Sequence, residues 1–495
     1  MPIMDEPTSL DPQIADSNSE KLVAANCYEG LVRIMADGTI GKGVATDWNI
    51  SDDGLTYTFK LRNNSHWAMF SGHKAVLGEN YEDTFDITVK AEDFKFGIER
   101  TLSEQTGSAD APLFSAVKSI STPDDFTIVF NLSYADDNFL YALTNPGAMP
   151  CDEEFFNLTN GKYGLDAKYL LCNGPFHVSK WTEKTSVKMV KNNEYNGESS
   201  VSPSSVTFYI NNNDSEVADK MNSVTYDVAF LSSSQFSSIE NKKDLNSVAV
   251  QNVTYSFIFN QNDNNYRNKN MRLAFCRSCD TSSLFDSQSD ISKADGIVPP
   301  SCKIGGEDYR NRNAAELLSY DETLAKKNFN DALLELGSSS VETTILCTEQ
   351  YEPFVKQMVQ KLQKTLGVKF VSTVKVVSES DLEAAVNDGN YSVAFYPFKA
   401  KSSFAGEIIE GFDQNNIFGY ESDVLSQKIR NIKNNSGSLE GERSAVADAE
   451  NYLVSEAVIM PVFYENSYFV TSKKTSGIYF YSSADNVCFI NAKKS

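Results

Sequence analysis

The sequence predicts an α/β protein of several domains, one of which is built on a mostly parallel β-sheet. Residues 341–396 alternate β-rich and helical runs in the order β-α-β-α-β, the pattern of parallel strands joined by right-handed crossover helices. Strand-like segments dominate the first third of the chain instead. The chain has 495 residues, of which 41% are hydrophobic and 12% aromatic, so it can form about three domains with substantial cores.

The first third is predicted to contain a strand-rich subdomain, at roughly residues 42–171. Residues 56–62 alternate apolar and polar side chains, the period of a half-buried strand, and residues 124–132 repeat the pattern after a second pair of aspartates. Residues 90–102 favour a helix, because large apolar residues recur at every fourth position.

The middle of the chain is polar, with short strands. A sharp turn is expected at Asn173-Gly174-Pro175-Phe176, followed by strands at 187–190 and 226–230. Residues 211–250 are rich in Ser and Asn, yet too short and mixed in composition to form a linker.

A second α/β lobe is predicted at roughly residues 255–463. Its strands are expected at 341–346, 368–377 and 391–396, and its helices at 352–366 and 381–386. Asp321 is a good N-cap for a further helix that Gly337 ends. Because parallel strands place ligands at their carboxyl ends, we expect a ligand site at that edge of the sheet.

Charge and hydropathy exclude some partners. The chain carries 44 basic and 67 acidic residues, a formal net charge of -23, which argues against nucleic acid because phosphate binding needs clustered Lys and Arg. No run of 18 apolar residues and no signal peptide is found.

The eight cysteines are scattered and do not form the framework of a small secreted domain. Cys276 and Cys279 have redox or zinc spacing, but no second pair is spaced for zinc, and the pair falls in a helical stretch where cysteine acts as a small core residue. A disulfide from one of these two residues to Cys302 stays open at this point.

The chain carries no recognisable catalytic constellation. His66, His73 and His177 have no metal-binding spacing, and no nucleophile elbow, P-loop or dinucleotide fingerprint occurs. Paired aspartates such as Asp52 and Asp53 precede strands and are better explained as turn residues. The sequence therefore predicts no enzyme, no metal and no cofactor.

A series of motifs, six of them in family order, resembles one known family. These are Ser9-Leu10-Asp11-Pro12, the stretch from Asn26-Cys-Tyr-Glu-Gly-Leu to Trp67, residues 87–94, Asn173-Gly-Pro-Phe176 with Trp181, Asn260 with residues 268–280, Ile297-Val-Pro-Pro300, and residues 391–398. Together they resemble the extracytoplasmic solute-binding proteins of family 5, the oligopeptide and dipeptide receptors of ABC transporters.

The resemblance implies a two-lobed periplasmic-binding-protein-like fold (type II, large peptide-binding class), with an inserted strand-rich subdomain and crossover hinge strands that close on the ligand. Lobe I would comprise residues 1–41, 172–254 and 464–495, with 42–171 as the inserted subdomain, and lobe II residues 255–463. The family further implies a peptide ligand, ABC permease subunits as membrane partners, a monomer, and a lipid-anchored extracytoplasmic location. In the family the Ser-Leu-Asp-Pro element follows a signal peptide and a lipid-bearing Cys, so this chain is expected to be a trimmed form.

Ligand contacts follow from the resemblance position by position. Asp16, Ser17 and Asn18 fall where the family's first lobe touches the peptide, since the spacing from Asp11 to Gly30 matches without gaps. Phe398 aligns with an aromatic residue that lines the cleft, and Tyr464 lies near a return crossover strand.

The chain departs from the family at Lys401. There the family often has an aspartate that pairs with the α-ammonium of the peptide, whereas a lysine repels an ammonium. Asp16 could supply the anchor instead, or the ligand could be blocked, anionic or not a peptide. The sequence thus predicts a peptide-binding component of an ABC importer. The alternatives are a receptor for an oligosaccharide, a metal chelate or a signalling peptide, and an oxidoreductase that uses Cys276 and Cys279.

Overall fold

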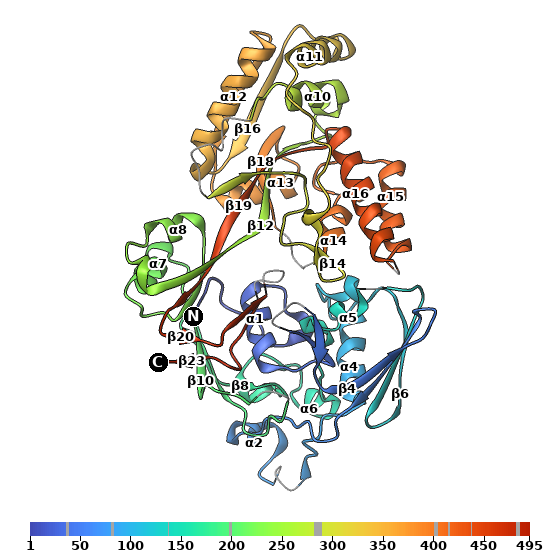
Figure 1. Cartoon of the computed structure of the whole chain (residues 1–495), viewed down its shortest axis with the longest axis vertical. Helices are drawn as coiled ribbons and strands as arrows, with labels where there is room; N and C mark the ends of the chain where they lie inside the picture. Colours follow the sequence, from blue (N-terminus) through green and yellow to red (C-terminus); the bar gives the residue numbers. More distant parts are fainter. Residues whose placement is uncertain are drawn as a thin grey trace. The chain divides into compact units, whose positions relative to one another are not determined.

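The chain divides into two compact units in the computed structural model, which describes all residues except 36–38, 81–83, 137, 198–199, 282–289, 400–403, 414–415, 437 and 482–485, and except the side chains of Tyr481 and Asn486. The first unit comprises Met1–Ala249 and Tyr468–Ser495, and the second comprises Val250–Ser467 (Figure 1). The lobe boundaries predicted from the sequence were 254/255 and 463/464. The inserted subdomain predicted at 42–171 stays a prediction.

Two four-stranded sheets organise the first unit. One has the order β1-β10-β9-β8, with bounds Pro2–Ile3, Ser205–Ile210, Ser186–Lys191 and Phe176–Thr182, and is antiparallel except where β1 joins β10. The other is antiparallel, β4-β5-β7-β6, with bounds Ala45–Ile50, Thr56–Leu61, Thr127–Leu132 and Val117–Asp124. The strands predicted at 56–62 and 124–132 are therefore confirmed, as neighbours in one sheet. The shorter strands are β2 (Val32–Ile34), β3 (Ile40–Lys42), β11 (Val228–Leu231), β20 (Thr475–Ser476), β21 (Tyr479–Tyr481), β22 (Asn486–Cys488) and β23 (Lys493–Lys494).

The helices of the first unit are short. They are α1 (Asn18–Cys27), α2 (Lys74–Leu77), α4 (Ala91–Leu102), α5 (Phe139–Ala142), α6 (Glu153–Leu158), α7 (Asp214–Asn222) and α8 (Ser233–Ser238), with 3-10 turns at Pro12–Ile14, Ser71–His73, Ala111–Phe114, Pro146–Ala148, Ala167–Tyr169 and Lys242–Asp244. The helix predicted at 90–102 is confirmed as α4, whose Phe94 and Ile98 are fully buried. They belong to the same core cluster as Phe59 and Phe130, two sheet residues whose rings meet edge to face at 5.8 Å.

Two of the sequence motifs fix loops of the first unit. Asp11 receives a bidentate bond from Arg100, with Nη2 to Oδ2 at 2.5 Å and Nη1 to Oδ1 at 3.2 Å, and this pair joins the Ser-Leu-Asp-Pro loop to α4. Asn173 donates to the carbonyl of Glu29 at 2.8 Å and accepts the Glu29 N–H at 3.0 Å. Gly174 follows because a Cβ there would lie 2.6 Å from the backbone nitrogen of Tyr28.

The second unit is built on a mixed sheet in the order β19-β12-β18-β16-β17. The bounds are Ile459–Ser472, Leu245–Phe259, Val393–Lys399, Val341–Cys347 and Phe370–Val376, and β13 (Ile291–Lys293) pairs with β19. β16 runs parallel to both β17 and β18, whereas β12 is antiparallel to β18. The predicted β-α-β-α-β segment is thus confirmed.

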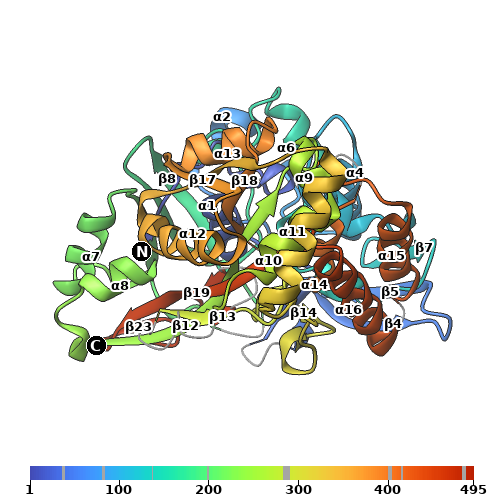
Figure 2. The ribbon, with the colours of Figure 1, turned by 90° about the horizontal axis from the view of Figure 1, so that it is seen from above.

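Helices cover both faces of this sheet, so the second unit has three layers (Figure 2). One face carries α10 (Lys269–Arg277), α11 (Glu322–Leu336) and α12 (Glu352–Leu366), and the other carries α13 (Glu379–Asn387), α14 (Ala405–Glu410), α15 (Asp423–Asn434) and α16 (Leu439–Ser455). Alternate residues of a strand enter the two cores: Phe257 joins the first and Ile258 the second. The remaining elements are α9 (Asn264–Arg267), β14 (Lys303–Ile304), β15 (Glu307–Asp308) and 3-10 turns at Tyr309–Asn311 and Glu349–Tyr351.

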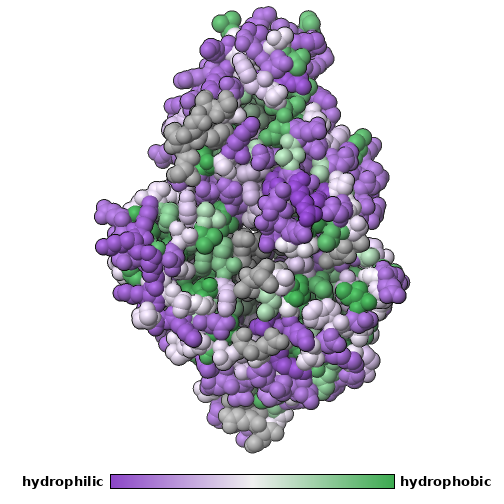
Figure 3. Space-filling view, in the orientation of Figure 1, coloured by the Kyte–Doolittle hydropathy of each residue, from purple (hydrophilic) through white to green (hydrophobic). Residues whose placement is uncertain are grey.

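The N-cap and the end that the sequence predicts for α11 are confirmed. The Asp321 carboxylate accepts the Leu324 N–H at 2.9 Å and caps α11, and Gly337 ends that helix at φ 62°. Polar side chains cover most of the face seen in Figure 3, in keeping with the net charge of -23.

Two long strands carry the chain from one unit to the other. β12 has 15 residues and contains the 249/250 boundary, and β19 has 14 residues and contains the 467/468 boundary. They are neighbours in the sheet and lie side by side in Figures 1 and 2.

A buried ion pair attaches the irregular segment 295–313 of the second unit to α16. Glu450, 1% exposed, pairs with Arg310 and also accepts the N–H groups of Ile297 at 2.7 Å and Val298 at 3.0 Å. The Tyr309 hydroxyl donates to the same carboxylate at 3.2 Å. Because this one side chain meets so many donors, its charge is fully compensated.

Glu450→Gln should therefore destabilise the protein strongly, since it leaves the Arg310 guanidinium buried without a counter-charge. We expect a loss of about 3–5 kcal/mol in the free energy of unfolding, measured by urea titration. Asp448→Asn is the matched control on the same helix: it breaks an exposed pair with Lys428, which should contribute about 0–1 kcal/mol. Equal, small losses for the two variants would contradict this assignment.

Candidate functional site

The carboxyl edge of the second unit's sheet collects polar and aromatic side chains. β16, β17 and β18 end there at Cys347, Val376 and Lys399. The antiparallel β12 enters at the same edge, because its Val253 pairs with Lys399. β19 leaves there as well, since the Ser467 hydroxyl bonds to the carbonyl of Val250 at 3.3 Å. Ends of parallel strands are the usual position of ligands in α/β folds.

Phe398 lies at this edge on an aromatic stack. Its ring is 5.9 Å from that of Phe412 and 5.8 Å from that of Phe418, and these two rings are themselves parallel at 4.5 Å. Phe412 and Phe418 are buried, whereas Phe398 is half-buried. The ring of Phe398 is therefore packed against buried aromatic residues, while the residue itself stays half-buried.

Tyr464 is buried, with 2% of its surface exposed. Its hydroxyl oxygen accepts the Asp295 N–H at 3.1 Å and lies 3.4 Å from the carbonyl oxygens of Gly296 and Val298. Burial raises the pKa of this phenol above its ordinary value. Tyr464 thus holds the 295–298 loop, and its contact with a ligand stays a prediction.

Asp16, Ser17 and Asn18 are brought together at the start of α1 in the first unit. Ser17 caps the helix: its hydroxyl accepts the Glu20 N–H at 3.2 Å, and the Glu20 carboxylate accepts the N–H groups of Asp16 and Ser17. The side chains of Asp16 and Asn18 are exposed. Lys401, the sixth predicted contact, lies outside the described residues.

A carboxylate that the sequence reasoning missed also lies at the carboxyl edge of the second unit. Glu465 of β19 accepts hydrogen bonds from the Tyr351 hydroxyl and from Gln350 Nε2, the latter at 3.3 Å. Burial raises the pKa of its carboxyl, with smaller contributions from Glu379 and Asp290. No periodicity or motif marks this residue; it follows a run of strand residues, and only the fold brings it to Tyr351.

Gln251 of β12 was missed for the same reason. Its Nε2 group donates to Ser292 Oγ and to Asn466 Oδ1, both at 2.8 Å. The interaction joins three separate strands of the second unit beside the point where the chain leaves it.

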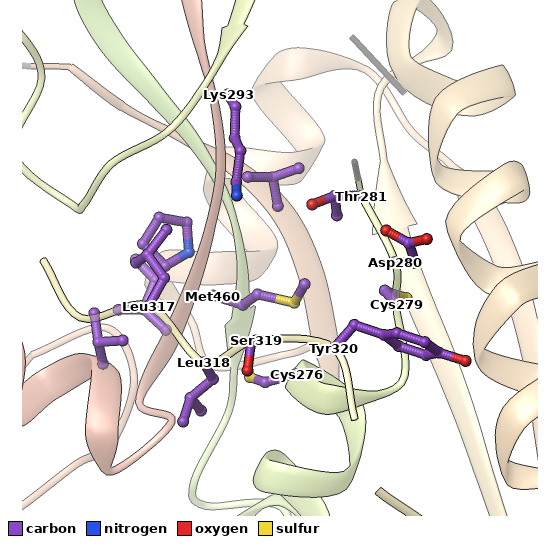
Figure 4. A pocket seen from close by; sticks show the side chains of 14 residues that line it. Cys276, Cys279, Asp280, Thr281, Lys293, Leu317, Leu318, Ser319, Tyr320 and Met460 are labelled. Carbon is purple, nitrogen blue, oxygen red and sulfur yellow. The ribbon is translucent and has the colours of Figure 1, made fainter. Parts of the chain in front are cut away.

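A pocket of about 200 Å³ opens elsewhere in the second unit (Figure 4). Its wall includes Cys276 and Cys279, apolar residues 459–462 at the start of β19, and Lys293. The pocket lies at the start of β19, whereas Glu465 follows in the middle of the same strand.

The two cysteines in this wall are poor candidates for thiol chemistry. Both are free and at most 3% exposed, and so is Cys302, so the disulfide left open by the sequence is not formed. Burial raises the pKa of the Cys276 thiol to about 12 and also raises that of Cys279. A reactive dithiol needs the opposite shift, because the thiolate is the nucleophile.

The described part of the chain shows neither a metal site nor a membrane span. Among these residues no group of three or more His, Cys, Asp or Glu side chains could hold a metal ion. Within the same residues, no helix combines the length and apolar character needed to cross a bilayer.

The model of the bacterial extracellular solute-binding proteins, family 5 (middle part), matches residues 39–418. The chain belongs to this family of extracellular and periplasmic solute-binding proteins. It is a family of binding proteins of peptide ABC transporters and not of enzymes.

Relatives and solved structures match nearly the whole length of this chain. The dipeptide-binding protein DppE of Bacillus subtilis is 24% identical over 96% of this chain and 88% of its own length. The structure of Listeria monocytogenes OppA bound to peptide has a TM-score of 0.76 at 20% identity, covering 100% of this chain and 98% of that one. A dipeptide-binding protein from Pseudoalteromonas, solved with Met-Leu, has a TM-score of 0.79 at 18% identity, covering 100% and 99%. This family-5 protein therefore has the α/β fold of peptide-binding proteins.

All eight thiols of the family-5 protein should titrate with a chromogenic disulfide reagent after denaturation without reductant, because the cysteines are free. In the native protein Cys276 and Cys279 should react slowly, since both are buried and protonated. A count below eight would reveal a disulfide, and fast native reaction of two thiols, abolished by Cys276→Ser, would revive the oxidoreductase alternative.

Proposed function

We propose that this protein is the substrate-binding component of an ABC importer for oligopeptides, which it captures outside the cytoplasm and delivers to membrane permease subunits. The family match over residues 39–418 carries the proposal. Relatives described as dipeptide- and oligopeptide-binding proteins support a peptide ligand. The proposal includes a lipid anchor on the mature chain and action as a monomer.

The proposed mechanism is ligand-driven closure of the two units about β12 and β19. Both unit boundaries fall inside these continuous strands, so small changes of backbone dihedrals near 249/250 and 467/468 would move one unit against the other. Each unit supplies part of the predicted contact set: Asp16, Ser17 and Asn18 from the first, and Phe398, Lys401 and Tyr464 from the second.

The accessible part of Phe398 is proposed to pack against an apolar side chain of the peptide, since its ring is held by Phe412 and Phe418. Tyr464 is proposed to act on the ligand through the 295–298 loop that its hydroxyl holds. Lys401 would favour an anionic group and disfavour an ammonium near it.

Addition of peptides should stabilise the protein against heat, because a ligand that binds only the folded state shifts the unfolding equilibrium. At a hundredfold excess of ligand over Kd the gain is about 2.7 kcal/mol. The measurement is a thermal melt in a mixed tripeptide and pentapeptide pool, with an oligosaccharide pool at the same concentration as control. A shift with oligosaccharides and none with peptides would replace the proposed ligand class.

A further inference from the structure

Among the described residues, the closest ion pairs of buried carboxylates all have an arginine as the cation. Asp11 is paired with Arg100, Glu29 with Arg62, and Glu450 with Arg310, and each carboxylate side chain is at most 5% exposed. This follows from the large cost of placing an unpaired charge in a medium of low polarity.

Glu465 differs from these three carboxylates. Its side chain is partly buried, yet among the described residues no Lys, Arg or His forms an ion pair with it. Its bonds come from two neutral donors, the Tyr351 hydroxyl and Gln350 Nε2. The charges felt from its surroundings are those of Glu379 and Asp290, which are negative as well.

Aromatic rings adjoin this carboxylate. Tyr351 lies 4.4 Å from Tyr255 between ring centroids, and Phe463 lies 5.1 Å from Tyr255 and 5.7 Å from Tyr351. Rings of this kind attract cations through their electron-rich faces, and they lower the polarity around the carboxylate, which strengthens its field.

The position of Glu465 gives a ligand access to it. It is half-buried, at the carboxyl edge of the sheet of the second unit, and two residues from the 467/468 boundary. The same edge carries Phe398, so both groups belong to the region where ligands of parallel sheets bind.

We propose that Glu465 is the binding site for a cationic group of the ligand, either the α-ammonium of a peptide or the side chain of its lysine or arginine. Tyr351 and Gln350 both donate to one oxygen of the carboxylate, so Gln350 still holds that oxygen without the Tyr351 hydroxyl, and the other oxygen is left for the cation. The proposal rests on the proposed function, because it names the charge class that this peptide receptor selects.

The test is capture from two randomised tripeptide pools, one with free amino termini and one N-acetylated, followed by mass spectrometry of the bound peptides and calorimetry with the most enriched ones. The variant is Glu465→Gln, which keeps the shape and can still accept a bond from Tyr351. The matched control is Glu349→Gln, which removes a carboxylate from an exposed residue nearby in the same unit.

We expect Glu465→Gln to bind the cationic peptides of the wild type at least about tenfold more weakly, as for loss of a charged hydrogen bond, while Glu349→Gln binds them as the wild type does. If the α-ammonium is recognised, acetylation abolishes wild-type capture. If a side chain is recognised, lysine and arginine peptides stay enriched in the acetylated pool and lose that enrichment in Glu465→Gln.

Tyr351→Phe provides a second readout, should Glu465→Gln fold poorly. It removes the hydroxyl and keeps both the ring and the charge, so selection for cationic peptides should persist. Peptide capture that is unchanged in Glu465→Gln, or selection lost in Tyr351→Phe, overturns the proposal and leaves the proposed function intact. A wild-type protein that retains no peptide from either pool contradicts both.

Discussion

The chain crosses between its two units twice, and the rest of the structure depends on this constraint. Each passage is a continuous strand, β12 or β19, with a unit boundary inside it. Both strands are held in the second unit by polar side chains near that boundary: Gln251 bonds to Ser292 and Asn466, and Ser467 to the backbone of Val250. Hydrogen bonds of this kind are individually modest in net free energy, so they set a register at these positions without the stability of an apolar core.

The carboxylates of this protein that are buried or half-buried have two kinds of hydrogen-bond partner, charged and neutral. Arginine pairs with Asp11, Glu29 and Glu450, and each pair joins segments of one unit that are far apart in the sequence. The half-buried carboxylate of Glu465 instead accepts hydrogen bonds from neutral donors. A charge compensated inside the protein contributes to a rigid lobe, whereas a half-buried charge without a counter-charge at the carboxyl edge of the sheet is available to a ligand.

Much of the fold could be predicted from the sequence, because its signals are local. The 341–396 segment follows from hydrophobic periodicity, and α11 from the cap at Asp321 and the left-handed Gly337. The motif residues Asp11, Asn173 and Gly174 could be recognised, but their partners are far away in the chain: Arg100 is 89 residues from Asp11 and Glu29 is 144 from Asn173. Sequence patterns do not show which distant residues pair with each other.

The site was less predictable for the same reason. Tyr464 was placed near a crossover strand, but its burial depends on residues 295–298, which reach it from more than 160 residues away. Glu465 carries no motif at all, and its character comes from Tyr351, 114 residues earlier in the chain. Residue type and spacing identify local chemistry, whereas the partners that compensate a charge are brought together only by the fold.

Small-angle scattering of the protein with and without a saturating bound peptide tests the central claim most directly. If β12 and β19 act as the hinge of a peptide receptor, the liganded protein should have a smaller radius of gyration than the ligand-free protein. An unchanged radius at saturation, with binding verified in the same sample by calorimetry, would contradict closure about the two crossover strands.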